Sequence, residues 1–186
     1  LGGERFLDEA FTRERLGQVA RRGAPFAVLH VATHFKLVPG REEESHLLLG
    51  DGDLLSLRQL RSDVTLAFGT YDLVTLSACN TSVGGGPAGA GSDRPGAEFE
   101  GLATTLMRKG ARAVMATLWE VQDEGTARLM QAFYAARGEE RQRNKAQALR
   151  EAQLAMIRGK LRDGAGRLDF RHPYYWAAFV LMGNWL

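Results

Sequence analysis

Apolar residues fall into four runs along the chain. The runs include β-branched residues and are eight to ten residues long, which is typical of buried strands in a parallel sheet. They are residues 26–34, 71–79, 111–118 and 174–183.

Between these runs, apolar residues recur every three or four positions, which is the spacing of one helix face. The segments with this spacing are residues 12–22, 98–109, 123–136 and 144–158. Helices that alternate with buried strands predict an α/β sandwich, in which a mostly parallel sheet carries helices on both faces.

Shorter signals predict smaller elements. Two leucine-rich stretches flank the turn sequence at residues 50–53, which indicates an inserted β-hairpin. Ser56 can cap a short helix that reaches Arg61, and residues 4–8 are expected to form an edge strand. Residues 80–97 are rich in glycine and lack any periodic pattern, so we expect a long mobile loop.

Length and composition favour one soluble globular domain. The chain has 186 residues, of which 45% are hydrophobic and 25% charged, and this is enough to form a core unaided. No run reaches the roughly 18 apolar residues of a membrane span, and the first residues do not resemble a signal peptide. We therefore expect a cytoplasmic location without membrane contact. Because the sequence starts at Leu1, we also expect it to be part of a longer protein.

Charge gives little reason to expect a nucleic-acid partner. The formal net charge is only +2, although residues 126–171 hold 11 basic and 5 acidic groups. The most basic stretch, residues 141–145, contains no aromatic residue and no recognition motif, so it is interpreted as the solvated start of a helix.

Candidate chemistry lies where two of the predicted strands end. One run ends at His34 and the next at Cys79, and ligand sites in open α/β sheets lie outside the carboxyl ends of the strands. Imidazole and thiol on neighbouring strand ends can act as general base and nucleophile. Cys79 is the only cysteine, so it cannot form an internal disulfide, but a lone cysteine is also a common buried hydrophobe.

No cofactor or metal site is expected. His30 and His34 are four residues apart on a strand, about 13 Å, and lack the helical zinc motif. His30 is interpreted as a hydrogen-bonded core residue. The glycine-rich stretch contains neither a phosphate-binding nor a dinucleotide-binding fingerprint.

Four motifs, in this order along the chain, resemble those of the CHAT domain family, a caspase- and separase-like group of bacterial cysteine peptidases that is often fused to helical repeats. His34 precedes Cys79 by 45 residues, similar to the spacing of about 50 in caspases. The resemblance covers nearly the whole chain from Pro25 onward and implies a caspase-like three-layer sandwich. The motifs are Ala32-Thr33-His34, Ser77-Ala78-Cys79-Asn80-Thr81, Leu118-Trp119-Glu120-Val121-Gln122-Asp123 and His172-Pro173-Tyr174-Tyr175-Trp176-Ala177-Ala178-Phe179.

The resemblance implies roles for individual residues. Cys79 would attack the scissile carbonyl, and His34 would stabilise the thiolate and protonate the leaving amine. The backbone N–H groups of Cys79 and Phe35 would hold the oxyanion, although much of the clan has glycine where this chain has Phe35. Asp123 would bind an Arg or Lys side chain at P1, the substrate residue before the cleaved bond, or it is simply a helix cap. If P1 is basic, Arg94 is a candidate site of self-cleavage or inhibition.

Two functional classes remain at this point. The first is a cysteine endopeptidase for a protein or peptide substrate, regulated by an attached helical-repeat domain or by a partner that orders residues 80–97. The second is a catalytically silent interaction module in a signalling assembly. The presence of both His34 and Cys79 favours the peptidase.

Overall fold

The computed structural model describes residues 3–22, 27–36, 38, 41–77, 97–119, 121–139, 144–166 and 168–186, with the backbone alone for residues 97–100 and 139. A four-stranded sheet runs through the middle of these residues in the order β1-β5-β6-β7. Its strands are β1 (Val28–Ala32), β5 (Leu73–Ser77), β6 (Ala113–Thr117) and β7 (Phe179–Gly183).

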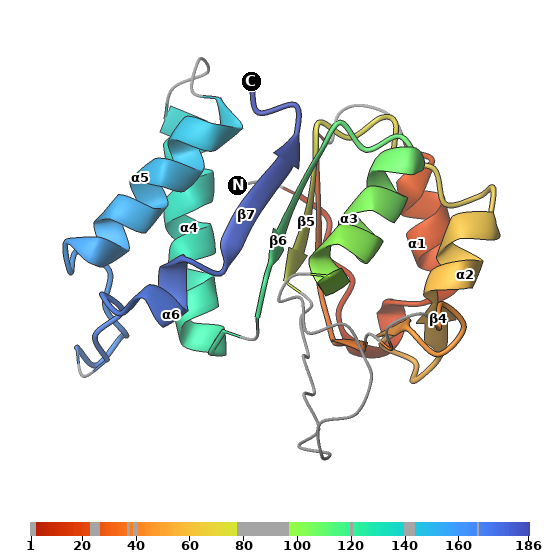
Figure 1. Cartoon of the computed structure of the whole chain (residues 1–186), viewed down its shortest axis with the longest axis horizontal. Coiled ribbons are helices and arrows are strands. Elements are labelled where there is room, and N and C mark those ends of the chain that lie inside the picture. The colour runs from red at the N-terminus through yellow and green to blue at the C-terminus, as the bar shows by residue number, and fades with distance from the viewer. Residues whose placement is uncertain are drawn as a thin grey trace.

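The first three strands of this sheet are parallel, and β7 is antiparallel to β6. Every residue of β6 and all but the last of β5 are buried, as expected for central strands covered on both faces. The parallel register sets Ala32 beside Ser77, so β1 and β5 end at the same edge of the sheet. We call this the carboxyl edge; it lies at the lower end of β5 and β6 in Figure 1.

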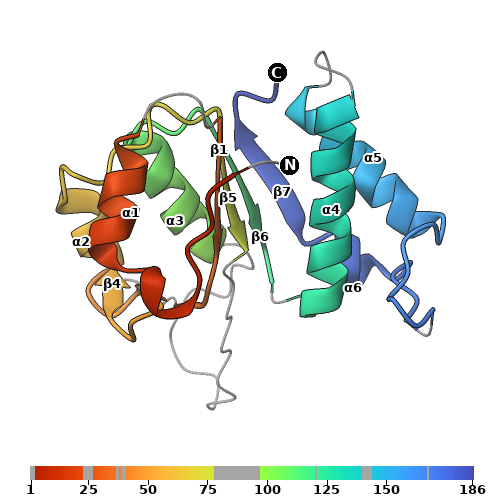
Figure 2. The ribbon, with the colours of Figure 1, turned by 180° about the vertical axis from the view of Figure 1, so that it is seen from behind.

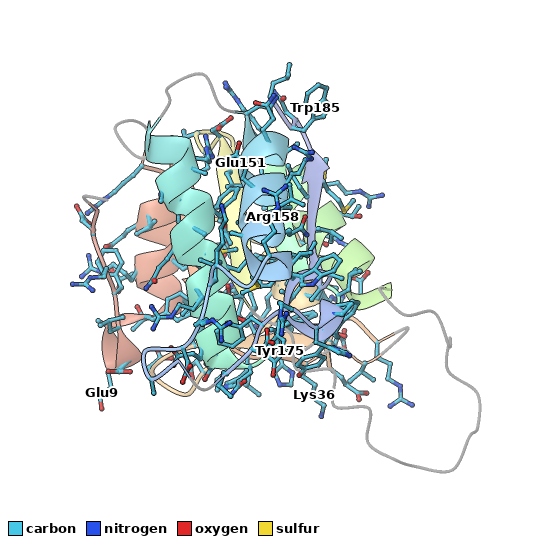
Figure 3. The ribbon with its side chains drawn as sticks, turned by 90° about the vertical axis from the view of Figure 1, so that its left-hand side faces the viewer. Glu9, Lys36, Glu151, Arg158, Tyr175 and Trp185 are labelled. Atoms are coloured by element: carbon cyan, nitrogen blue, oxygen red, sulfur yellow. The ribbon has the colours of Figure 1, made fainter. Side chains whose placement is uncertain are left out.

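Helices cover both faces of the sheet, which confirms the predicted three-layer sandwich (Figures 1 and 2). One layer contains α1 (Arg13–Ala20), α2 (Leu57–Ser62) and α3 (Ala97–Arg108), and the other contains α4 (Asp123–Glu139), α5 (Lys145–Ile157) and α6 (Pro173–Trp176). Two separate hydrophobic clusters form the core, one on each side of the sheet. Figure 3 shows the α4 and α5 layer from outside, with Arg158 on its outer surface.

Local sequence signals explain where several helices begin. The Thr12 side chain accepts a hydrogen bond from the Arg15 N–H at the start of α1, and Asn144 accepts one from the Gln147 N–H at the start of α5. Ser56 and Gln59 form a reciprocal capping box at α2.

A small antiparallel sheet lies beside the carboxyl edge. It consists of β2 (Phe35–Lys36), β3 (His46–Leu48) and β4 (Leu54–Ser56) in sequence order, and β3 and β4 form the predicted hairpin. β2 follows His34 directly and pairs with β3, so this small sheet fixes the chain on the far side of the histidine.

Two element predictions are wrong. Residues 4–8 form no strand; a cavity of about 790 Å³ is lined by both this segment and β1, and Asp8, with φ 47°, already begins a short 3₁₀ helix, η1 (Asp8–Ala10). The last apolar run starts as helix α6 and not as a strand, because Pro173 fixes a helical backbone and His172 accepts the Tyr174 N–H. Residues 80–96 of the predicted mobile loop lie outside the described residues.

The prediction of a solvated basic helix start is also wrong for Lys145, the one basic residue of that stretch that the structure describes. The Lys145 side chain is fully buried, and its Nζ donates to Asp72 Oδ1 at 2.8 Å and to the Leu186 carbonyl. Arg137 of α4 also pairs with Asp72, at 3.1 Å. Asp72, just before β5, therefore ties α4 and α5 to the sheet at the end opposite the carboxyl edge.

Candidate active site

A cavity of about 450 Å³ opens at the carboxyl edge, between the sheet and the first turns of α4. We call it the edge pocket. Three strands reach it with residues at or near their carboxyl ends, and the Asp123, Thr126, Ala127 and Met130 side chains of α4 form the opposite wall. The lining from the strand side is His30, Ala32, Thr33, His34, Ser77 and Thr117.

His34 lies two residues after β1 and lines the edge pocket. The Thr33 N–H donates to the Ser77 carbonyl at 3.2 Å, which continues the β1–β5 pairing beyond both strand ends. The Leu48 N–H donates to the His34 carbonyl at 2.9 Å and anchors the backbone from the other side. The imidazole itself is exposed and has no hydrogen-bond partner among the described residues, so it is available to a substrate or a nucleophile.

Asp123 is the first residue of α4, and its side chain lines the same pocket. It has no ion pair or hydrogen bond within the described part of the chain, so the alternative of a hydrogen-bonded helix cap has no support there. The amino end of a helix carries a partial positive charge, which interacts favourably with an acidic side chain at this position. Asp123 is thus a negative charge that is free to pair with a cationic group in the pocket.

The tryptophan motif and the final motif meet at the same edge. The Trp119 Nε1–H donates to the Tyr174 carbonyl at 2.9 Å, and the Leu118 N–H donates to the Ala178 carbonyl at 2.9 Å. Tyr175 packs edge-on against Phe170, with ring centroids 5.1 Å apart. In Figure 3 Tyr175 lies at the same lower end of the molecule as Lys36, two residues after His34. These contacts brace the turn that leads into α4 and Asp123.

His30 also lines the edge pocket and is exposed, so its placement in the core is wrong, whereas the prediction that it is hydrogen-bonded is confirmed. Its Nε2 lies 3.0 Å from Ser77 Oγ, and its Nδ1 lies 3.1 Å from the Tyr134 hydroxyl, which in turn donates to Thr75 Oγ1 at 3.1 Å. By surface area His30 is exposed, with a cavity on either side, although neighbouring protein atoms displace part of the water around its ring. This desolvation lowers the pKa of His30 below its ordinary value of 6.5.

The signal for His30 was present in the sequence. Side chains two and four residues apart on a strand point to the same face. A pocket that contains the His34 side chain is therefore expected to contain the side chains of residues 32 and 30 as well. Tyr134 gave no such signal, because only the packing of α4 on the sheet brings it to His30.

The family model of the CHAT domain matches residues 2–184. The chain belongs to the CHAT domain family. No curated protein matches it. The family is related to caspase-like peptidases, and the three-layer architecture of this CHAT domain is consistent with a caspase-like fold.

Two predicted residues of this CHAT domain, Cys79 and Arg94, lie outside the described residues. In the sequence Cys79 comes two positions after Ser77, the last residue of β5 and part of the pocket lining. Of the predicted site residues that the structure describes, His34 and Asp123 lie in one pocket, and Phe35 is next to His34.

The backbone conformation at Phe35 is one that any residue can adopt, so this position does not require glycine. Its side chain is 4% exposed and packs in the core, and its φ angle is not positive. Because the Leu48 N–H bonds to the His34 carbonyl, Phe35 and Leu47 form a non-hydrogen-bonded pair of the β2–β3 ladder. The Phe35 N–H therefore points away from β3 and is not used by that strand.

Two further tests concern metals and membranes. Among the described residues, no three His, Cys, Asp or Glu side chains are close enough together to bind a metal ion. In the same part of the chain, every helix is too short or too polar to cross a bilayer.

Proposed function

We propose that this CHAT domain is a cysteine endopeptidase that cleaves a protein after Arg or Lys, with His34 and Cys79 as its catalytic pair. The observation that carries the proposal is that one cavity is lined by His34, by an unpaired carboxylate at Asp123 and by the end of β5 at Ser77. Cys79 follows Ser77 by two positions in the sequence, and two residues of backbone span at most about 7 Å.

The proposed reaction uses these groups in a defined order. The Cys79 thiolate attacks the carbonyl carbon after the basic residue, and the oxyanion accepts hydrogen bonds from the N–H groups of Cys79 and Phe35. The His34 imidazolium then protonates the leaving amine, which releases the carboxyl-terminal product and leaves an acyl-enzyme. Water, deprotonated by His34, hydrolyses the thioester and restores the thiol.

Asp123 gives the proposed preference for a basic P1 side chain. An exposed carboxylate in a partly enclosed cavity binds a guanidinium through two parallel hydrogen bonds, or an ammonium as a point charge. A neutral P1 side chain would leave the Asp123 carboxylate unpaired, and an acidic P1 side chain would be repelled by it.

Regulation by an attached domain or by a partner belongs to the same proposal. Such a partner would act on the segment that follows Cys79 in the sequence and contains Arg94. Self-cleavage at Arg94 is the corresponding hypothesis for switching. An intact Arg94 bond in an enzyme that turns over peptides would refute it.

A digest of a peptide library tests the reaction and the pocket together. We expect the wild-type chain to give products that end in Arg or Lys, Cys79→Ala to give none, and Asp123→Asn to lose the preference by at least tenfold. Products without a basic P1, or equal cleavage by Cys79→Ala, would contradict the proposal.

Thiol alkylation separates the peptidase from the silent interaction module without a substrate. A thiolate activated by His34 reacts rapidly at neutral pH and slows in His34→Ala, because the thiolate and not the thiol is the nucleophile. Slow and equal labelling of both proteins would favour the interaction module.

A further inference from the structure

The edge pocket extends beyond His34 and Asp123 to His30. His30 lies four residues before His34, so its Cα atom is up to about 13 Å further from the carboxyl edge than that of His34, although its ring reaches Ser77. On the facing helix, Tyr134 lies 11 residues after Asp123, about 16 Å along the axis. His34 and Asp123 thus mark the outer end of the pocket, and His30 marks its inner end, where Tyr134 contacts it.

We propose that His30 is a specificity-determining residue of the edge pocket, held in place by Ser77 and Tyr134, so that the pocket binds a cationic side chain more tightly while His30 is uncharged. The inference rests on the proposed preference for a basic residue at P1. It adds a second histidine, with a role distinct from that of His34.

Both ring nitrogens of His30 are engaged, and one arrangement satisfies every group. Tyr134 donates its hydroxyl proton to Thr75 Oγ1 and accepts from the His30 Nδ1–H, while the Ser77 hydroxyl donates to the unprotonated Nε2. A rotation of the Ser77 hydroxyl would let Nε2–H donate instead. Protonation can therefore add a charge without displacing the ring, and the expected effect is electrostatic.

The charges around His30 make its state matter. Within the edge pocket the other titratable groups are His34 and Asp123, and Tyr134 contacts the ring from α4 with Arg137 one turn beyond it. On the opposite side, the larger cavity brings charged groups of the amino-terminal segment and α1 toward β1. These are Glu4, Arg5, Asp8, Arg15 and Arg22, together with the neutral Tyr71.

With His30 neutral, Asp123 attracts a cation into the pocket. With His30 protonated, a second positive charge stands at the inner end and opposes the ligand. At a separation of about 10 Å and an effective dielectric constant near 20, this repulsion weakens binding by roughly tenfold. Desolvation lowers the pKa of His30, so the loss is expected below pH 6.5 and not at neutral pH.

The test uses benzamidine, a reversible cation that mimics an arginine side chain, and the unmodified chain. Calorimetry between pH 8 and pH 5 should show an affinity that falls about tenfold as the solution becomes acidic. His30→Gln retains hydrogen-bonding groups but cannot become charged. The change in log Kd between pH 8 and pH 5 should therefore be at most half as large in this variant as in the wild-type chain. His34→Gln is the matched control, and its affinity for benzamidine should still show the part of the pH dependence that is due to His30.

A second measurement needs no variant at this position. Coupling between ligand and proton is reciprocal, so saturating benzamidine should move the NMR titration of the His30 ring to lower pH. An unchanged His30 titration, an equal pH dependence in His30→Gln, or no benzamidine binding at any pH would each overturn the inference. A failure of Cys79 to react would instead refute the peptidase and leave this pH-linked binding intact.

Discussion

Replacing Asp72 by alanine should destabilise the fold through the buried Lys145. The Lys145 ammonium is 1% exposed, and Asp72 is its only carboxylate partner in the described part of the chain. Removing one member of a buried ion pair typically costs about 3–5 kcal/mol, because the other charge remains buried without compensation. Asp72 itself is 29% exposed, so we expect the lower end, about 3 kcal/mol.

The expected loss can be measured as a shift in the thermal midpoint. For a chain of this size each kcal/mol corresponds to about 2–4 °C, so Asp72→Ala should lower Tm by roughly 6–12 °C in differential scanning calorimetry. Glu44→Gln removes an exposed ion pair with Arg41 and is the matched control, expected to cost at most about 1 kcal/mol. A Tm loss in Asp72→Ala no larger than in this control would refute the reasoning.

The pair also has a pH signature with a definite sign. Burial alone would raise the pKa of Asp72, but hydrogen bonds from Lys145 and Arg137 outweigh it and hold this pKa below 3.8. A lowered folded-state pKa means that the stabilisation is present above the unfolded value of 3.8 and is lost as pH falls through the folded value. Wild-type stability should therefore fall below pH 4, and the gap to Asp72→Ala should narrow there.

Further predictions concern the turns and the site scaffold. Gly50→Ala would place a Cβ 1.7 Å from the Asp8 carbonyl oxygen and should cost about 1–3 kcal/mol in urea unfolding, whereas Gly138→Ala in α4 meets nothing within 4 Å and should stabilise by about 0.5–1 kcal/mol. Equal effects of the two alanines would contradict this packing. The Thr65 hydroxyl, the Arg13 guanidinium and the Thr65 N–H lower the pKa of Asp63 to about 2, so its stabilisation is complete above pH 3.8 and is lost as pH falls through 2. Carboxyl NMR should show that midpoint, and Thr65→Val should raise it; a midpoint near 3.8 in the wild type would be the contrary result. Tyr134→Phe should broaden the NMR signals of the His30 ring and leave those of the other histidines unchanged. A uniform change across all histidines would contradict this prediction.

Much of the fold is readable from local sequence. The capping box at Ser56 and Gln59 needs only residues three positions apart, and the buried strands β5 and β6 are continuous apolar runs. α6 was missed although Pro173 marks it, because the apolar run that follows has the composition of a strand.

Features set by long-range contacts could not be predicted from the local sequence. Lys145 looks like a surface residue of a basic stretch, and its burial depends on Asp72, 73 positions away, and on the Leu186 carbonyl, 41 positions away. In the same way, the chemistry of His30 depends on Tyr134, which is 104 positions away. The common pocket of His34 and Asp123 was predicted through family resemblance, since residue types alone could not bring α4 to the end of β1.

The most direct test of the account is covalent labelling with a peptidyl-arginine chloromethyl ketone, followed by intact-mass spectrometry. The probe needs a cation-binding pocket and an activated thiol in one place. We predict one adduct on Cys79, no adduct in Cys79→Ser, much slower labelling in His34→Ala, and loss of the preference for arginine over aspartate probes in Asp123→Asn. No adduct on the wild-type chain, or equal labelling by arginine and aspartate probes, would contradict it.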